Sequence, residues 1–396
     1  MDHNVPPPAI RKDSIYGTFI FEFGAPGGDW DQDSLISALV TCLPGLRVRR
    51  VHGIFNTYRP GGLQVRRLVN LFAVYVRTLF QVIGGKQDVI IVRSSPPGIQ
   101  LWVAWLAHWR KIPVIYWLMD SHPEMEARIC DHRGWRRVAR VLRRVDAWAM
   151  RTMAAVIVLD DSMAERAHAL APEVPVVVHP PWNRDVGVPY DPISYVPGSD
   201  AGVRRFGYAG NLGVAHDPQG LMRVALAARA YGRVEMHFIS ATESTKAHFQ
   251  PLLEAGVEVQ FHPRVKSFLD LKEVFERLRL DLGVVLLDQD SAGLVSPSKF
   301  TAYLKFGLPV LYIGPEKTNT ELICARFGAG WRLPNGASDV QIQSVVGKIW
   351  DAQSLTEARS KLPDAAGYFW RLNEHSLAAA LVPHVPQARS HLRCRI

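Results

Sequence analysis

The alternation of short apolar segments with longer helical patterns runs through the whole chain, and it limits the fold more than any other feature. Runs of Val, Ile, Leu and Phe recur between stretches whose apolar residues follow a helical period. This alternation is typical of α/β proteins, because a parallel strand is reached from its neighbour through a crossover helix. The chain has 396 residues, which is enough for two domains of about 150–200 residues each.

The expected strands fall into two groups, and a proline-rich segment from Pro180 to Gly198 separates them as the expected linker. The first group is predicted at Tyr16–Phe23, Arg47–His52, Asp88–Val92, Pro113–Leu118, Ala155–Leu159 and Val174–Val178. The second is predicted at Arg205–Ala209, Val234–Ile239, Val257–Phe261, Leu280–Leu286 and Pro309–Ile313. Two Rossmann-like domains would place a ligand cleft at the carboxyl ends of their strands.

The stretch from Ser296 to Val310 predicts a loop, a helix of two to three turns and a buried strand. Pro297 and Gly307 are start and stop signals for that helix, which places Lys299 in its first turn. A cation is unfavourable beside the positive end of a helix unless an anion binds there. Lys299 is therefore a candidate anion ligand, and an ordinary surface lysine is the alternative.

A glycine-containing turn is expected directly after the first strand of the second group. Gly210 and Gly213 allow a ligand to approach the backbone closely, and Asp217 is the expected N-cap of the helix that follows. His216 lies between them in the chain. It either contacts a bound sugar or phosphate, or caps the helix.

Two segments of the first half carry further candidate residues. Gly27 and Gly28 follow the first strand and leave room for a ligand, although a flexible surface loop fits them too. Asp120, His122 and Glu124 follow the end of a buried strand, where α/β enzymes place reactive groups. Asp120 or His122 is the candidate base for an acceptor hydroxyl, or a ligand of the acceptor sugar. Glu124 either joins them or caps the next helix.

These segments resemble those of retaining GT-B glycosyltransferases, most closely the family-4 (group 1) enzymes that build bacterial polysaccharides. The resemblance rests on Pro-Ser-Lys followed by Gly-Leu-Pro-Val, on Tyr-Ala-Gly-Asn-Leu-Gly with Ala-His-Asp, on Pro-Gly-Gly and on Asp-Ser-His-Pro-Glu. It implies the GT-B fold, in which two Rossmann-like domains with parallel sheets face an interdomain cleft. Residues 1–180 would bind the acceptor and residues 181–363 the nucleotide-sugar, with a helix in about 364–396 packing back onto the first domain.

The resemblance also implies a role for each candidate residue. The implied donor-binding residues are Gly210, Asn211, Gly213, His216, Asp290, Ser298, Lys299 and Thr301. The implied catalytic residues are Asp120, His122 and Lys299, and the loop that faces the acceptor or the transferred sugar holds Gly27, Gly28 and Glu124.

Two positions depart from the family pattern. Asn211 stands where many relatives have a basic residue, which leaves more of the phosphate charge to Lys299. Ala302 stands where the family has a glutamate that binds the ribose hydroxyls, and Thr301 offers one weaker hydrogen bond instead. Losing the carboxylate contact would cost about 1–3 kcal/mol.

The expected activity is transfer of a sugar from a UDP- or GDP-sugar to a polyprenyl-linked or saccharide acceptor in exopolysaccharide or cell-surface glycan synthesis. The resemblance implies retention of the anomeric configuration, no metal and no cofactor besides the nucleotide-sugar co-substrate. Two alternatives remain open: a nucleotide-sugar 2-epimerase on the same fold, and a non-catalytic glycosyltransferase-like scaffold, which Ala302 favours.

The charge of the chain suggests a membrane surface as a partner. The net charge is +9, and Gly134–Thr152 holds six arginines and one aspartate along an amphipathic helical pattern. Leu63–Phe80 is a second basic amphipathic segment. Such helices bind anionic lipid, and the alternative is that their apolar faces pack on the sheet. Nucleic acid is not expected as a partner, because the sequence has no recognisable nucleic-acid-binding module besides its positive charge.

The expected location is cytoplasmic and peripheral, at the inner face of the cell membrane. The first residues, Met1 to Ser14, have no apolar signal core, and no run of 18 apolar residues predicts a spanning helix. The cysteines are scattered without ligand spacing, so we expect reduced thiols and no metal site.

Overall fold

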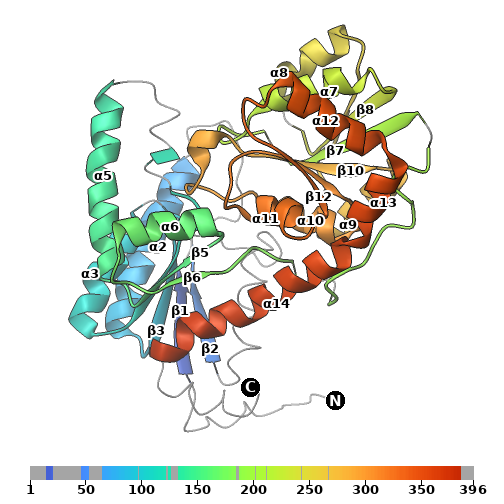
Figure 1. Ribbon diagram of the computed structural model, residues 1–396. Helices are drawn as coiled ribbons and strands as arrows, with labels where there is room; N and C mark the ends of the chain where they lie inside the picture. The colour runs from blue at the N-terminus through green and yellow to red at the C-terminus, as the bar shows by residue number, and fades with distance from the viewer. Residues whose placement is uncertain are drawn as a thin grey trace, which may run out of the picture.

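The computed structural model describes residues 15–20, 46–52, 65–96, 98–121, 124–125, 133–183, 187–200, 202–210, 212–241, 243–265 and 267–384. Among these residues, no helix combines the length and the apolar composition needed to cross a bilayer. The described residues form two domains, each built on one parallel sheet (Figure 1).

The N-terminal domain contains a six-stranded sheet in the order β2-β1-β3-β4-β5-β6, and all its neighbouring strands are parallel. The strands are β1 (Ile15–Ile20), β2 (Leu46–Val51), β3 (Val89–Arg93), β4 (Val114–Trp117), β5 (Ala155–Val158) and β6 (Val176–Val178). The central strands β4 and β5 are buried at every position, as expected where a parallel sheet is covered on both faces.

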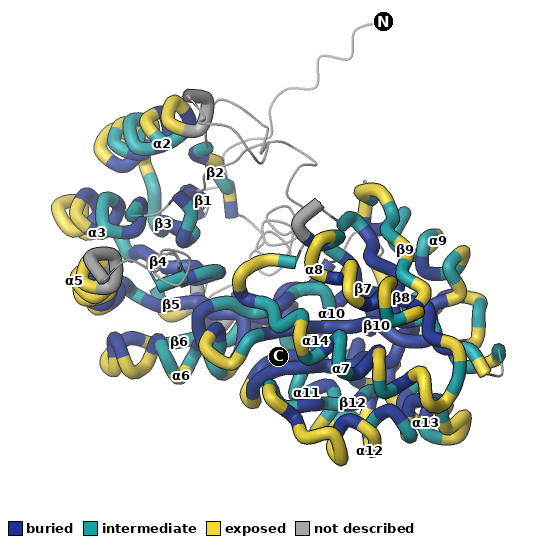
Figure 2. The backbone as a smooth tube through the Cα atoms, turned by 90° about the horizontal axis from the view of Figure 1, so that it is seen from above, coloured by how far each residue is buried: buried dark blue, intermediate teal, exposed yellow. Residues whose placement is uncertain are grey.

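The helices of this domain are α2 (Val65–Gly84), α3 (Ile99–Arg110), α5 (Arg133–Arg151) and α6 (Asp161–Leu170). Figure 2 shows α2, α3 and α5 next to one another on the side of the N-terminal domain that lies farthest from the other sheet. The basic pattern predicted over Gly134–Thr152 is α5, and the pattern predicted over Leu63–Phe80 falls largely in α2.

The C-terminal domain contains a second six-stranded parallel sheet, in the order β12-β11-β10-β7-β8-β9. Its strands are β7 (Val203–Ala209), β8 (Arg233–Ile239), β9 (Glu258–His262), β10 (Leu282–Leu286), β11 (Val310–Ile313) and β12 (Gly330–Leu333). Strand β12 is not among the strands predicted from the sequence, because the segment is short and begins with a glycine. A β-carbon at Gly330 would lie 2.1 Å from the carbonyl oxygen of Val310, so the close approach of β12 to β11 requires glycine there.

The helices of the C-terminal domain cover both faces of its sheet. They are α7 (Pro218–Ala228), α8 (Glu243–Glu254), α9 (Phe268–Arg277), η1 (Gln289–Ser291), α10 (Phe300–Lys305), α11 (Asn319–Ala325), α12 (Asp339–Trp350), α13 (Ala352–Ser360), α14 (Leu362–Leu381) and η2 (Val382–His384). Asp217 caps α7 as predicted, since its carboxylate accepts hydrogen bonds from the backbone N–H groups of Gln219 and Gly220.

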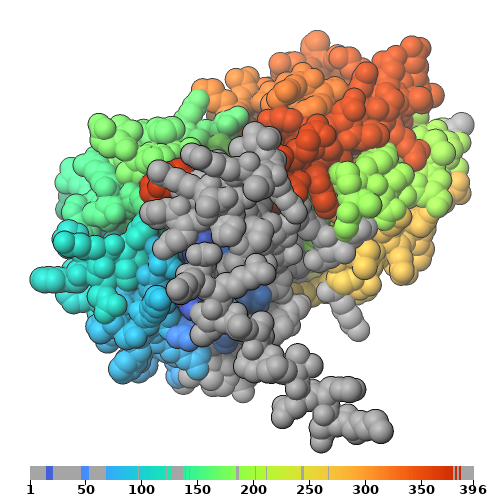
Figure 3. Space-filling model, turned by 90° about the horizontal axis from the view of Figure 1, so that it is seen from below, coloured from blue at the N-terminus to red at the C-terminus, as the bar shows by residue number. Residues whose placement is uncertain are grey.

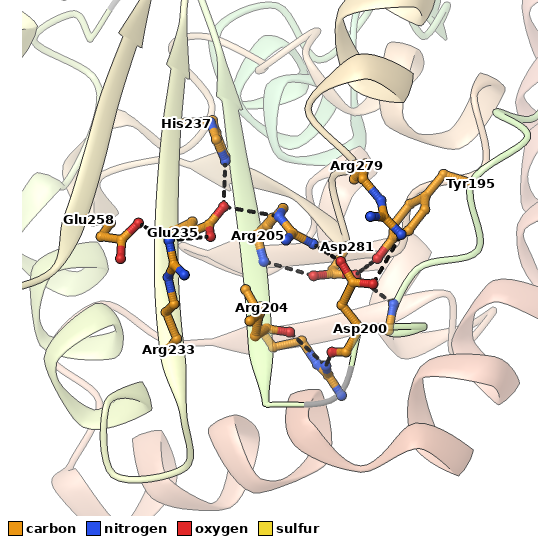
Figure 4. A network of polar contacts seen from close by, with 12 residues as sticks. Tyr195, Asp200, Arg204, Arg205, Arg233, Glu235, His237, Glu258, Arg279 and Asp281 are labelled. Carbon is orange, nitrogen blue, oxygen red and sulfur yellow. Dashed lines mark hydrogen bonds and ion pairs between the residues drawn. The ribbon is translucent and has the colours of Figure 1, made fainter.

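A polar network holds the chain leading into β7 against the amino-terminal edge of this sheet (Figure 4). The buried carboxylate of Asp281 accepts hydrogen bonds from the backbone N–H groups of Gly198 and Arg205. The Arg205 guanidinium donates to Asp200 over 2.7 Å and to Glu235 over 3.0 Å. These contacts fix where β7 begins, so the opposite end of β7 is free to form a site.

Helix α14 belongs to the cores of both domains. Leu362 and Phe369 lie in the apolar core of the C-terminal domain, whereas Leu377 lies in that of the N-terminal domain. The Phe369 ring stacks on Trp182 with an interplanar angle of 3°. The side-chain amide of Asn373 donates to the carbonyl oxygen of Pro180 over 2.8 Å. In Figure 3 the red atoms of α14 lie against the green atoms of the N-terminal domain.

The loops at the carboxyl ends of the two sheets also touch. Asp120 forms an isolated antiparallel bridge with Val295, and the N–H of Ser121 donates to the carbonyl oxygen of Leu294 over 2.8 Å. The Asn319 amide donates to the carbonyl oxygen of Leu159 over 2.8 Å. Both strand ends that carry candidate residues are therefore held beside each other.

The position of Phe369 gives a stability prediction. Phe369→Ala removes a fully buried ring and should lower the free energy of unfolding by about 3–5 kcal/mol. Urea unfolding followed by tryptophan fluorescence measures this change. Arg371→Ala, at an exposed position of the same helix, is the matched control and should change stability by less than about 0.5 kcal/mol. Equal effects of the two substitutions would show that the Phe369–Trp182 contact does not hold α14 in place.

Candidate functional site

Lys299 lies at the end of the loop that connects β10 to α10. The predicted helix is shorter than expected, since α10 has six residues and Lys299 is its N-cap rather than part of its first turn. The boundary moves because the N–H of Thr301 turns back to the carbonyl oxygen of Ser298 before the regular helical pattern starts. The predicted stop is confirmed, because Gly307 has a φ of 79°.

Helix α10 is fastened to the end of β7 by a tyrosine that the sequence analysis did not single out. The Tyr303 hydroxyl accepts a hydrogen bond from the N–H of Ala209 over 2.8 Å and donates one to the carbonyl oxygen of Gly207 over 3.0 Å. The ring is fully buried, and burial raises the pKa of its hydroxyl. This contact holds Lys299 beside the turn that follows β7.

The Lys299 ammonium lies among residues of that turn. Its Nζ is 3.0 Å from Nε2 of His216 and 4.8 Å from the centre of the Tyr208 ring. Gly210 has a φ of 104°, and a β-carbon there would lie 3.1 Å from Cε of Lys299. Both the backbone conformation and the close lysine therefore require glycine at position 210.

The electrostatics of this group favour an anion. Burial lowers the pKa of Lys299 to about 8, because a buried ammonium loses its hydration. Burial and the neighbouring charge of Lys299 lower the pKa of His216 to about 3. At pH 7 His216 is therefore neutral and Lys299 is mostly protonated. Nε2 of His216 lies 3.0 Å from Nζ of Lys299, and Nδ1 lies 2.8 Å from the backbone nitrogen of Gly213.

A pocket of about 310 Å³ opens next to Lys299. It is lined by Ala209, Gly210, Ser240, Val265, Ser267, Phe268, Leu271, Ser298, Lys299, Thr301 and Ala302. Its lining combines the Lys299 cation with the apolar side chains of Val265, Phe268 and Leu271. A ligand with an anionic part and a flat, apolar part fits this distribution.

The candidate donor residues differ in their relation to this pocket. Gly210, Ser298, Lys299 and Thr301 line it, whereas His216 and Gly213 lie behind the ammonium. The buried Thr301 hydroxyl donates to the carbonyl oxygen of Ser298 over 2.9 Å. Asp290 is exposed in η1 and does not line the pocket.

The candidate residues of the N-terminal domain lie beyond the pocket lining. Asp120 is half-buried, and its partner Val295 belongs to the loop that leads to Lys299. The carboxylate of Glu124 accepts a hydrogen bond from Ser121 over 2.8 Å and pairs with two arginines, Arg143 and Arg166. The remaining candidates, Gly27, Gly28, His122 and Asn211, lie outside the described residues.

The wall formed by Ser240, Val265, Phe268 and Leu271 was missed by sequence reasoning. These residues follow β8 and β9, and only the arrangement of the sheet brings them to the same pocket as Lys299. Tyr208 could have been found from the sequence, because it lies two residues before Gly210 in an apolar strand. Within the described ranges, no group of three or more His, Cys, Asp or Glu side chains is arranged to hold a metal ion.

Part of the chain matches a known protein-family model. Residues 24–182 match the model of the glycosyl transferase 4-like domain. No curated protein sequence matches the chain.

Solved structures resemble the chain over most of its length. WaaG, a glycosyltransferase involved in lipopolysaccharide biosynthesis, is 13% identical with a TM-score of 0.59, and the match covers 93% of this chain and 100% of WaaG. Anabaena HepE in complex with UDP is 13% identical with a TM-score of 0.59, covering 91% and 98%. Sucrose-phosphate synthase from Thermosynechococcus elongatus is 13% identical with a TM-score of 0.56, covering 92% and 100%.

The two parallel sheets and these structures define the fold as GT-B, which confirms the fold expected from the sequence. The match to the glycosyl transferase 4-like domain, over residues 24–182, lies within the N-terminal of the two GT-B domains.

The buried charge of Lys299 gives a pH-dependent prediction. Its pKa is about 8 in the folded protein against an ordinary value of 10.5, so the unfolded chain holds this proton more tightly and protonation penalises the folded state. Lys299→Met removes the penalty and should raise the free energy of unfolding at pH 7. The gain should shrink as the pH rises from about 8 toward 10.5. Urea unfolding at pH 7 and pH 10 measures both values, and a gain that grows with pH would contradict the assignment.

Proposed function

We propose that the chain transfers a sugar from a nucleoside-diphosphate sugar to a polyprenyl-linked or saccharide acceptor in exopolysaccharide or cell-surface glycan synthesis, with retention of configuration. The observation that carries the proposal is the Lys299 ammonium beside the Gly210 turn, in the lining of a pocket that also contains apolar side chains. HepE, which has the same fold, binds UDP in its solved structure.

In this mechanism the departing nucleoside diphosphate is stabilised by positive charge that is already in place. The negative charge on the diphosphate grows as the bond to the sugar breaks, and a preorganised cation lowers the energy of that state. Lys299 supplies the cation, because the N–H groups of Gly210 and Gly213 already donate to the carbonyl oxygen of Ile239 and to Nδ1 of His216. The nucleoside part fills the pocket against Val265, Phe268 and Leu271.

The acceptor approaches from the N-terminal domain. Asp120 is the proposed base or acceptor ligand on the described part of this edge, and its bridge to Val295 keeps it beside the loop that holds Lys299. His122, Gly27 and Gly28 are proposed to complete the acceptor side. Glu124 is already bound by Ser121 and two arginines, so we assign it the role of fixing this segment.

The lining of the pocket keeps a non-catalytic scaffold as the second candidate function. Ala302 lines the pocket without a polar atom, and the Thr301 hydroxyl donates to a backbone carbonyl group. The ribose contact that the family resemblance implies therefore has no carboxylate here. A non-catalytic scaffold would bind no nucleotide, whereas a 2-epimerase would turn over nucleotide-sugar without an acceptor.

Nucleotide binding tests the donor site. Calorimetry with UDP, GDP and ADP should detect one nucleoside diphosphate, and Lys299→Ala should weaken it about 10- to 100-fold, since a charge-assisted contact contributes about 1.5–3 kcal/mol. Lys348→Ala, at an exposed position of α12 in the same domain, is the control and should leave the affinity unchanged. Affinity should fall above pH 8, where Lys299 loses its proton. Absence of binding to all three nucleotides would favour the scaffold.

Metal removal tests how the leaving group is stabilised. If Lys299 supplies the required charge, transfer activity should be unchanged after treatment with EDTA and after later addition of Mn²⁺. A coupled assay of nucleoside diphosphate released from the donor, with acceptor present, measures the transfer activity. Loss of activity with EDTA and its return with Mn²⁺ would show that a divalent ion takes part.

A further inference from the structure

Three neighbouring helices of the N-terminal domain expose large apolar side chains on one outer face. Phe72 and Phe80 on α2, Trp105 and Trp109 on α3, and Val141 and Trp148 on α5 have between 50 and 74% of their surface exposed. We call these residues the outer face. Soluble proteins rarely expose so many large apolar groups together unless the patch binds something.

The three helices form one continuous layer because α3 joins the other two. The Trp102 indole donates to the carbonyl oxygen of Tyr75 in α2 over 3.2 Å. The Gln100 amide donates to the carboxylate of Asp146 in α5 over 2.8 Å. Figure 2 shows this layer on the side of the domain away from the C-terminal domain, with exposed segments along each helix.

Packing on the sheet does not account for the apolar pattern of α5. Among the α5 side chains that the structure describes, Ala147, Ala149 and Met150 belong to the domain core. Val141 and Trp148 lie on another side of the helix and remain more than half exposed. The fold therefore buries only some of the apolar residues of α5, and those that remain exposed indicate an external partner.

The charge of the layer indicates which partner fits. Helix α2 contains three arginines, α3 one and α5 seven. The one acidic residue in these helices is Asp146, which is buried and bound by Gln100. A second copy of the same face would bring like charges together, whereas a surface of lipid phosphates would neutralise them.

We propose that the outer face of α2, α3 and α5 binds an anionic lipid bilayer. The rings of Trp105, Trp109 and Trp148 enter the region between headgroups and acyl chains, where amphipathic aromatic rings are favoured. The arginines of the same helices pair with lipid phosphates. This contact is independent of nucleotide binding, and it would bring a lipid-linked acceptor close to the N-terminal domain if the proposed function holds.

A basic pocket continues this surface. The pocket has a volume of about 550 Å³ and is lined by Arg49, Arg50 and Arg77 together with Phe80 of the outer face. Phe80 therefore belongs to both features. Guanidinium groups arranged around a hollow next to an inserted ring suit a phosphate headgroup, because arginine pairs with phosphate through two parallel hydrogen bonds.

Vesicle binding tests the proposal on the full-length chain without nucleotide. The wild type should sediment with vesicles of phosphatidylglycerol and phosphatidylcholine in equal parts, but not with phosphatidylcholine alone. Trp105→Ser combined with Trp109→Ser should reduce the partition coefficient about tenfold or more, since each ring contributes buried apolar area. Arg137→Gln, Arg140→Gln and Arg144→Gln together should reduce it roughly a hundredfold at low salt, at about 1 kcal/mol per charge.

The matched control carries Leu269→Ser and Val340→Ser, two exposed apolar residues of the C-terminal domain, and should bind vesicles like the wild type. Thermal midpoints of all variants show that they fold, and their nucleotide affinities separate this test from that of the proposed function. Vesicle binding that none of the substitutions changes would overturn the proposal. The proposal would also be overturned if analytical ultracentrifugation showed a dimer for the wild type and a monomer for the tryptophan variant, because the outer face would then join two copies.

Discussion

The arrangement of the molecule depends on one helix that is buried in two hydrophobic cores. Helix α14 places Phe369 in the core of the C-terminal domain and Leu377 in that of the N-terminal domain. Each domain buries its own part of α14, so this helix links the positions of the two domains. The loop contacts between Asp120 and Val295 and between Ser121 and Leu294 then fix which strand ends meet, and the candidate site lies where they do.

Much of the fold could be predicted from the sequence, because burial on both faces of a parallel sheet leaves apolar runs such as Val156–Leu159. The glycine signals were also local: Gly307 ends α10, and Gly210 allows Lys299 to lie against the backbone. The second wall of the pocket could not be predicted. Val265 and Phe268 line the same pocket as Lys299 because of the order in which β7, β8 and β9 pair. No single segment of the sequence predicts that order.

The contacts of Thr301 and Lys299 can be compared with the roles that the family resemblance implies for them. The sequence singled out Thr301 as a substitute ribose ligand, but its buried hydroxyl donates to the carbonyl oxygen of Ser298. Lys299 was singled out as an anion ligand, and its neighbours Tyr208 and His216 hold the ammonium without adding a negative charge of their own. Among the described residues that line the pocket, Lys299 is the one cation, and its charge has a large effect where the surroundings are of low polarity.

The cations of α2, α3 and α5 are all arginines, and these helices contain no lysine. A guanidinium keeps its proton throughout the physiological pH range, and acetylation of lysine does not alter it. The positive charge of these arginines is consequently permanent. Attachment through them would follow the lipid composition and the ionic strength around the protein, and their own charge would change neither with pH nor with lysine acetylation.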